Sequence, residues 1–162
     1  MVTPFPWVYP YEEDSARLGV AVLRPVVSVA LVGDAGAGAP VYALVDSGCG
    51  HTLAAPWLAD EIGVDPDDSD RQIVLGLGGE NVLVRFLDVR VRLLAPGGDE
   101  TDFFEWHDEV GFLRSWRPTW PVLLGQVAFM RTFTVTMSRH AQALAVSDRD
   151  DFDRRFGVQL AP

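Results

Sequence analysis

The sequence contains one cysteine, few basic residues and no long apolar run, and each shortage narrows the class of protein. Cys49 has no partner for an internal disulfide, which agrees with a reducing compartment. Only 13 basic residues stand against 23 acidic ones, and the net charge of −10 repels phosphate backbones and anionic lipid heads. We therefore expect no nucleic acid and no membrane among the partners.

The sequence also lacks the usual signals for membrane insertion and for secretion. The most apolar stretch, residues 20–32, contains Arg24 and Pro25, and it is shorter than the about 20 apolar residues that a membrane-spanning helix needs. The first residues lack the basic start and apolar run of a secretory signal. These shortages predict a cytoplasmic protein.

The composition that remains is that of one folded, turn-rich domain. A chain of 162 residues can bury roughly two-thirds of its unfolded surface in a single core. With 15 glycines, 11 prolines and 48% hydrophobic residues, it suits strands joined by turns better than long helices. We expect a domain over residues 17–146. An aromatic and proline-rich arm precedes it at 1–16, and a tail follows at 147–162, in which Gly157 can end a short helix.

Runs of β-branched residues separated by turn residues predict the strands. Residues 18–32 and 41–45 are two such runs on either side of a glycine-rich turn, and residues 89–93 alternate apolar side chains with arginines. Residues 73–86 hold two more runs around a glycine-rich tip, which is a hairpin signal. A nucleotide-binding loop would instead lead from its glycines into a helix.

The chain is organised around residues 43–51, which read Ala-Leu-Val-Asp-Ser-Gly-Cys-Gly-His. An apolar strand delivers Asp46 to its end, where a carboxylate is costly unless hydrogen bonds or a reaction compensate for its desolvation. Gly48 and Gly50 permit tight turns and let amide N–H groups approach the carboxylate. Farther on, Pro56 can start and Gly63 can end a short helix, which we expect to cover this loop.

Three motifs in this order resemble those of the retropepsin-like aspartic proteases. Ala-Leu-Val-Asp-Ser-Gly at 43–48 resembles their active-site loop, and the glycine-rich tip at 76–81 resembles their flap. Leu-Leu-Gly at 123–125 resembles the apolar-apolar-Gly element that lies behind their catalytic loop. The resemblance covers roughly residues 18–146. It implies an all-β, mainly antiparallel closed barrel with one or two short helices.

The same resemblance implies the site residues and the partners. The catalytic residues would be Asp46, Ser47 and Gly48. The flap and the apolar-apolar-Gly element would bind a peptide or protein substrate through Leu75, Gly76, Leu77, Gly78, Gly79, Leu124 and Gly125. We expect no cofactor and no metal ion.

Aspartic protease chemistry needs two carboxylates that share a proton, one to take a proton from water and one to polarise the scissile carbonyl. This chain has one Asp-Ser-Gly, because Asp14 lacks the glycine and Asp34 lacks the hydroxyl. We therefore expect a homodimeric aspartic endopeptidase in which the two Asp46 residues meet at a two-fold axis. The alternative is a catalytically inactive domain of the same fold that binds a peptide or protein partner.

Other assignments of the reactive residues have less support in the sequence. Cys49 with a histidine base lacks a local nucleophile signature, and a lone cysteine is more often a small core residue. The three histidines are not paired at short helical spacing, as metal ligands often are. The aromatic residues at 102–121 fit either a core strand or an aromatic wall at a peptide site or subunit interface.

Overall fold

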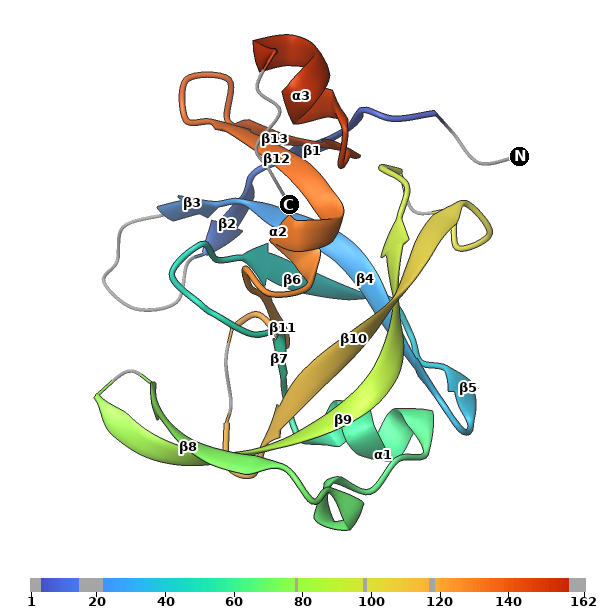
Figure 1. The fold of residues 1–162 in the computed structure, drawn as a ribbon, viewed down its shortest axis with the longest axis vertical. Helices are drawn as coiled ribbons and strands as arrows, with labels where there is room; N and C mark the ends of the chain where they lie inside the picture. The colour runs from blue at the N-terminus through green and yellow to red at the C-terminus, as the bar shows by residue number, and fades with distance from the viewer. Residues whose placement is uncertain (1–3, 15–21, 78, 98, 117–118, 158–162) are drawn as a thin grey trace.

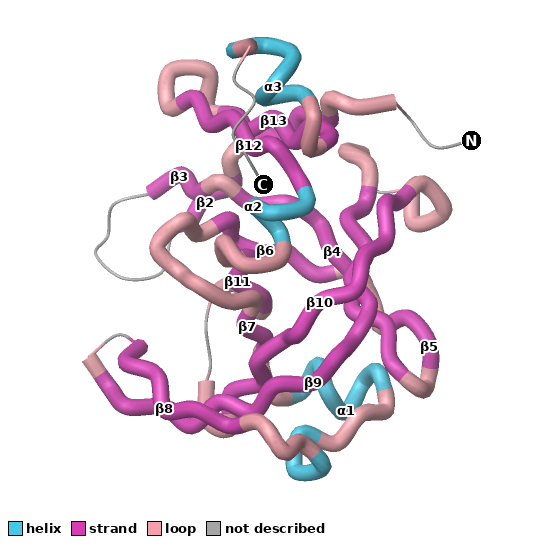
Figure 2. Tube along the Cα trace, in the orientation of Figure 1, coloured by secondary structure: helices cyan, strands magenta, loops and turns pink. Residues whose placement is uncertain are grey.

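The computed structural model describes residues 4–14, 22–77, 79–97, 99–116 and 119–157, and strands make up most of it (Figures 1 and 2). The strands are β1 (Trp7–Pro10), β2 (Glu12–Asp14), β3 (Val22–Arg24), β4 (Val26–Gly33), β5 (Gly36–Ala37), β6 (Val41–Val45), β7 (Leu53–Ala54), β8 (Gln72–Leu77), β9 (Glu80–Leu94), β10 (Phe103–Leu113), β11 (Val122–Leu124), β12 (Phe133–Ser138) and β13 (Ala143–Asp148). The helices are α1 (Trp57–Ile62), α2 (Phe129–Thr132) and α3 (Asp151–Phe156), with a 3₁₀ turn at Pro66–Asp68.

Six of these strands form a closed barrel. They follow the order β4-β6-β11-β7-β10-β9, and β9 pairs with β4 to close the ring. The pairings are antiparallel except for β6 with β11 and β7 with β10. The expected all-β, mainly antiparallel barrel with few short helices is therefore confirmed.

The long strands β9 and β10 show how the sequence pattern builds the barrel wall. On β9, Val91 and Leu93 are fully buried, whereas Arg90 and Arg92 lie outside and both pair with Glu105 on β10. The period-2 pattern thus sends apolar side chains inward and charges outward. Two of the four Phe and Trp residues of β10 join the core: Phe112 is 2% exposed, and Trp106 is 7% exposed with its ring edge-on against Phe133, whereas Phe104 is 37% exposed. β10 is therefore a wall strand of the barrel that contributes Trp106 and Phe112 to the core.

Strands from near the two ends of the chain pair in a smaller, three-stranded sheet. β1 pairs with β13, and β13 pairs with β12, which places Trp7 opposite Val146. Trp7 and Tyr9 are buried, and the Tyr9 hydroxyl donates a hydrogen bond of 2.6 Å to the carbonyl of Leu94 at the end of β9. The N-terminal residues that the structure describes therefore pack on the barrel.

Helix α1 has the expected bounds but another position. Pro56 precedes it and Gly63 ends it in the left-handed region, with φ 72°. The helix packs against the β4–β5 hairpin, because the Ile62 carbonyl accepts the Ala35 amide and the Glu61 carboxylate accepts the Ala39 amide. The sequence had led us to expect that this helix covers the Asp46 loop, but it does not. None of the described helices is long and apolar enough to cross a membrane.

Candidate active site

Asp46 lies at the end of β6, where the core strand reaches the surface. Val45 is 3% exposed, whereas Asp46 is half-buried and Ser47 and Gly48 are exposed. β11 runs parallel to β6, and the Leu124 carbonyl accepts the amide N–H of Asp46 at 3.0 Å. The main chain therefore fixes the position of this aspartate while its carboxylate stays accessible.

Two hydrogen bonds between neighbouring residues shape the loop itself. The Gly48 amide donates to Oδ1 of Asp46 at 2.9 Å, and the Cys49 amide donates to the Asp46 carbonyl at 3.1 Å. A Cβ at position 48 would stand 3.2 Å from Asp46 Oδ1. The glycine therefore leaves room for the carboxylate to receive the amide, as the sequence pattern suggested.

The residues that follow β11 hold the Asp46 loop in place through hydrogen bonds. The amides of Gln126 and Val127 donate to the carbonyls of Cys49 and Gly50, and the Gln126 side-chain amide donates to the Ser47 carbonyl. Gly125 is indispensable to this approach, because a Cβ there would lie 2.4 Å from the His51 carbonyl oxygen and 2.6 Å from that of Cys49. Gln126 had no signal in the sequence, since its role depends on a contact between distant segments.

The β8–β9 hairpin and the Asp46 loop share a cavity of about 200 Å³. It is lined by Asp46, Gly48, Cys49, Gly50, His51, Leu53, Leu75, Gly76 and Leu123. The hairpin pairs Gln72 with Arg85 through Leu77 with Glu80, and Figure 1 shows β8 curving away from the barrel toward the tip that joins it to β9. The sequence-predicted hairpin thus exists, and it brings Leu75 and Gly76 to the aspartate.

The other residues assigned to substrate binding lie elsewhere. Leu77 is the last residue of β8, Gly79 occupies the turn with φ 88°, and Gly78 lies outside the described residues. Leu124 is fully buried in the main core, and Gly125 is buried beneath the loop. Leu123, its neighbour on β11, lines the cavity instead, because successive side chains of a strand point to opposite faces.

The thiol of Cys49 is in a poor environment for a nucleophile. Burial is the main cause that raises the pKa of the Cys49 thiol, a hydrogen bond with the main chain of His51 lowers it, and the Asp46 charge raises it further. The thiol itself donates to the His51 carbonyl at 3.1 Å. The His51 ring packs edge-on against Phe86, with 5.0 Å between the ring centroids. Since a thiolate is the reactive form of cysteine, these contacts favour a structural role for Cys49.

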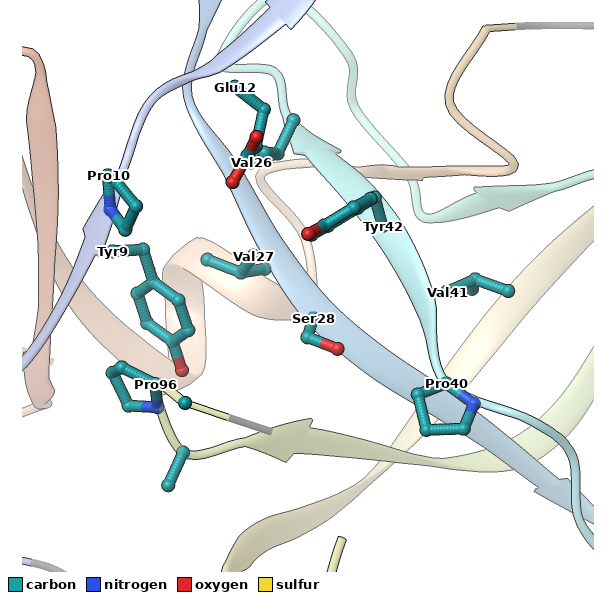
Figure 3. A pocket seen from close by; sticks show the side chains of 12 residues that line it. Tyr9, Pro10, Glu12, Val26, Val27, Ser28, Pro40, Val41, Tyr42 and Pro96 are labelled. Carbon is teal, nitrogen blue, oxygen red and sulfur yellow. The ribbon is translucent and has the colours of Figure 1, made fainter. Parts of the chain in front are cut away.

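A larger pocket of about 520 Å³ lies between β1, β4 and β6 (Figure 3). Tyr9, Tyr42 and three prolines contribute to its walls, and Glu12 is the one carboxylate among the described residues that line it. The Tyr9 hydroxyl is already bound to Leu94. Asp46 is not part of this pocket, so the candidate site is the smaller cavity.

Comparison with known proteins shows the family to which the chain belongs. A family model described as "Aspartyl protease" matches residues 13–98, which is more than half of the chain and includes both the Asp46 loop and the β8–β9 hairpin. The chain belongs to this aspartyl protease family. The retropepsin-like resemblance seen in the sequence is thereby confirmed. A search of curated proteins finds no match.

Two solved structures are similar to this aspartyl protease family member. One is a retropepsin-like aspartic protease from Rickettsia conorii, with 15% identity and a TM-score of 0.47 over 90% of this chain and 96% of that chain. The other is the retroviral protease-like domain of Ddi1 from Leishmania major, with 14% identity and a TM-score of 0.45 over 76% of this chain and 94% of that chain.

Proposed function

We propose that the protein is an aspartic endopeptidase that acts as a homodimer. The observation that carries the proposal is the Asp46 carboxylate, which receives the Gly48 amide at the mouth of a cavity shared with a hairpin. Membership of the aspartyl protease family supports the reaction type. In this proposal the protease unit spans residues 17–146, between the arm at 1–16 and the tail at 147–162.

The reaction requires a second carboxylate that one chain does not supply. Two Asp46 residues facing each other across a two-fold axis would share one proton, because like charges about 3 Å apart do not both ionise readily. One carboxyl would take a proton from the attacking water while the other would polarise the scissile carbonyl. Ser47 and Gly48 are exposed beside Asp46, so the loop is free to meet its copy.

The hairpin provides the substrate contacts of the proposal. A peptide lying over Asp46 would contact Leu75 and Gly76, and the end of the hairpin, with Leu77 and Gly79, would close over it. Leu124 and Gly125 would act indirectly, since their place beneath the loop fixes Asp46. Substrate would be a peptide or protein, and the cellular location that we propose is the cytoplasm.

The test is a cleavage assay on a mixed peptide library between acid and neutral pH, with a statine-type inhibitor and the variant Asp46→Asn as controls. The asparagine keeps an oxygen that accepts the Gly48 amide, so the variant should fold, but it lacks the shared proton. We expect cleavage by the wild type, inhibition by statine and at least a hundredfold loss in the variant, consistent with the loss of a general acid–base group worth about 10²–10⁴.

Sedimentation during turnover supplies the second readout. Activity should follow the dimer fraction when the protein is diluted. Turnover by a monomer, or full activity of Asp46→Asn, would refute the mechanism. A well-formed dimer that cleaves no peptide would instead favour the inactive peptide-binding domain.

A further inference from the structure

A second pocket adjoins the cavity at Asp46 and shares one wall with it. It has a volume of about 400 Å³, and His51 lines both spaces. Its other side chains come from separate parts of the fold: Thr52 follows the catalytic loop, His107 and Asp108 lie on β10, Arg131 lies on α2, and Arg149 follows β13. A peptide bound over Asp46 that continues past His51 would reach this pocket.

The cations of this pocket are the unusual feature. The sequence has no lysine, so arginine supplies all 13 basic residues. Within the described part of the chain, seven arginines form ion pairs with carboxylates, whereas Arg114, Arg131, Arg139 and Arg149 form none, and two of these four line this one pocket. Two uncommitted guanidinium groups at one pocket stand out in a chain of net charge −10.

The two carboxylates beside these arginines are already engaged. Glu109 forms an ion pair with Arg71. Asp108 is 6% exposed, and its Oδ2 accepts the Thr52 hydroxyl at 2.6 Å. Burial raises the pKa of the Asp108 carboxyl, which outweighs the lowering by the Thr52 hydrogen bond. Since neither acid pairs with Arg131 or Arg149, both guanidinium groups remain available to an incoming anion.

We propose that this pocket binds an acidic side chain of the peptide substrate through Arg131 and Arg149. The identity of this ligand rests on the proposed function, because only a peptide bound over Asp46 brings its side chain past His51 to the pocket. A carboxylate fits the pocket because guanidinium groups bind it with paired N–H donors. Elsewhere the acidic surface repels such a group. The protein would therefore prefer Glu or Asp at the substrate position that lies beyond His51.

A binding experiment tests the pocket without requiring cleavage. The chain has three histidines, of which His51 and His107 line the pocket, while His140 lies in the turn between β12 and β13. The imidazole NMR signals are followed while N-acetyl-glutamate amide, or N-acetyl-glutamine amide as the neutral match, is added to a concentration on the order of 10 mM. We expect only the glutamate probe to shift His51 and His107, with His140 unmoved.

Arginine variants identify the groups that bind. Arg131→Gln and Arg149→Gln should each weaken the response to the glutamate probe by roughly three- to tenfold. Arg139→Gln is the matched control, since it removes the same charge from an exposed arginine outside the pocket. Equal shifts with both probes, no shift at all, or an equal effect of Arg139→Gln would overturn the assignment.

Cleavage supplies the specificity readout. Peptide libraries that carry Glu or Gln at one varied position are compared by kcat/KM, and one position should favour Glu by about three- to tenfold in the wild type and lose this preference in the two pocket variants. Cleavage without such a preference would overturn the substrate role. If no library is cleaved, the proposed protease function fails, whereas the histidine shifts still decide whether the pocket binds a carboxylate.

Discussion

The amide of Gly48 donates a hydrogen bond of 2.9 Å to Oδ1 of Asp46, two residues before it in the same loop. A charge-assisted bond of this kind orients a carboxylate that is otherwise half-exposed. It depends on residue 48 having no side chain, because a Cβ there would stand 3.2 Å from the same oxygen. The distance is tighter than ordinary van der Waals contact, and the carboxylate would have to move.

Gly48→Ala should therefore lower activity more than stability. A shift of a few tenths of an ångström takes the carboxylate out of its proper position relative to the substrate, and we expect kcat/KM to fall by about tenfold. The free energy of unfolding should fall by less than about 1 kcal/mol, because the crowded atom ends a side chain that can move. Gly50→Ala is the control, since nothing lies within 4 Å of a Cβ there. Equal kcat/KM in the two variants would contradict the idea.

Gly125→Ala should instead destabilise the fold. The new Cβ would meet two backbone carbonyls, those of His51 and Cys49, at 2.4 and 2.6 Å. Neither can move without displacing the loop, so the cost should be about 2–3 kcal/mol. Urea unfolding measures this cost, and Gly76→Ala on the open hairpin provides a comparison with no neighbour within 4 Å. A Gly125→Ala protein as stable as Gly76→Ala would show that the loop is free to shift.

The sequence predicted the elements of the site well because their signals are local. A β-branched run before Asp46 and glycines after it indicate a strand that ends in a tight loop. Pro56 and Gly63 likewise bracket α1, whose bounds are those expected. The hairpin follows from two apolar runs around glycines. In each case the residues that decide the conformation lie within a few positions of one another.

The placement of these elements depends on contacts that the sequence does not show. α1 lies against the β4–β5 hairpin because Ile62 and Glu61 accept amides from a hairpin more than 20 residues earlier. On β11, both Leu123 and Leu124 are apolar and buried, so composition could not tell which one faces the cavity. The three-dimensional pairing of β11 with β6 and β7 decides this.

The N-terminal strand should contribute much of the stability. Trp7 is 1% exposed and lies in the main core, so Trp7→Ala should cost about 3–5 kcal/mol of unfolding free energy. Val8, its neighbour on the same strand, is 54% exposed, and Val8→Ala should change stability by less than about 0.5 kcal/mol. Thermal or urea unfolding of the two variants makes the comparison. Similar midpoints would mean that β1 does not dock on the barrel in solution.

Asp108 should make stability depend on pH in a defined direction. Burial raises the pKa of its carboxyl in the folded protein. In the unfolded chain an aspartate ionises near pH 3.9. Between these two pKa values the folded state binds more protons than the unfolded state, so the free energy of unfolding falls as pH rises through this window. Above the window, the loss of stability caused by ionising the buried carboxyl stays constant. At lower pH the carboxyl is protonated in both the folded and the unfolded state, and this loss of stability disappears.

Asp108→Asn should remove this cost, since an amide does not ionise and its oxygen still accepts the Thr52 hydroxyl. The difference in unfolding free energy between variant and wild type should therefore shift in favour of the variant as pH rises from about 4 to 7. The neighbouring groups His51, His107, Glu109, Arg131 and Arg149 are present in both proteins, so this difference isolates most of the Asp108 contribution.

Asp88→Asn is the control, because it removes the same charge from an exposed site on β9 and should show no comparable trend. Urea midpoints at several pH values decide the matter, and parallel curves for wild type and Asp108→Asn would mean that the buried carboxyl ionises as easily as one in water.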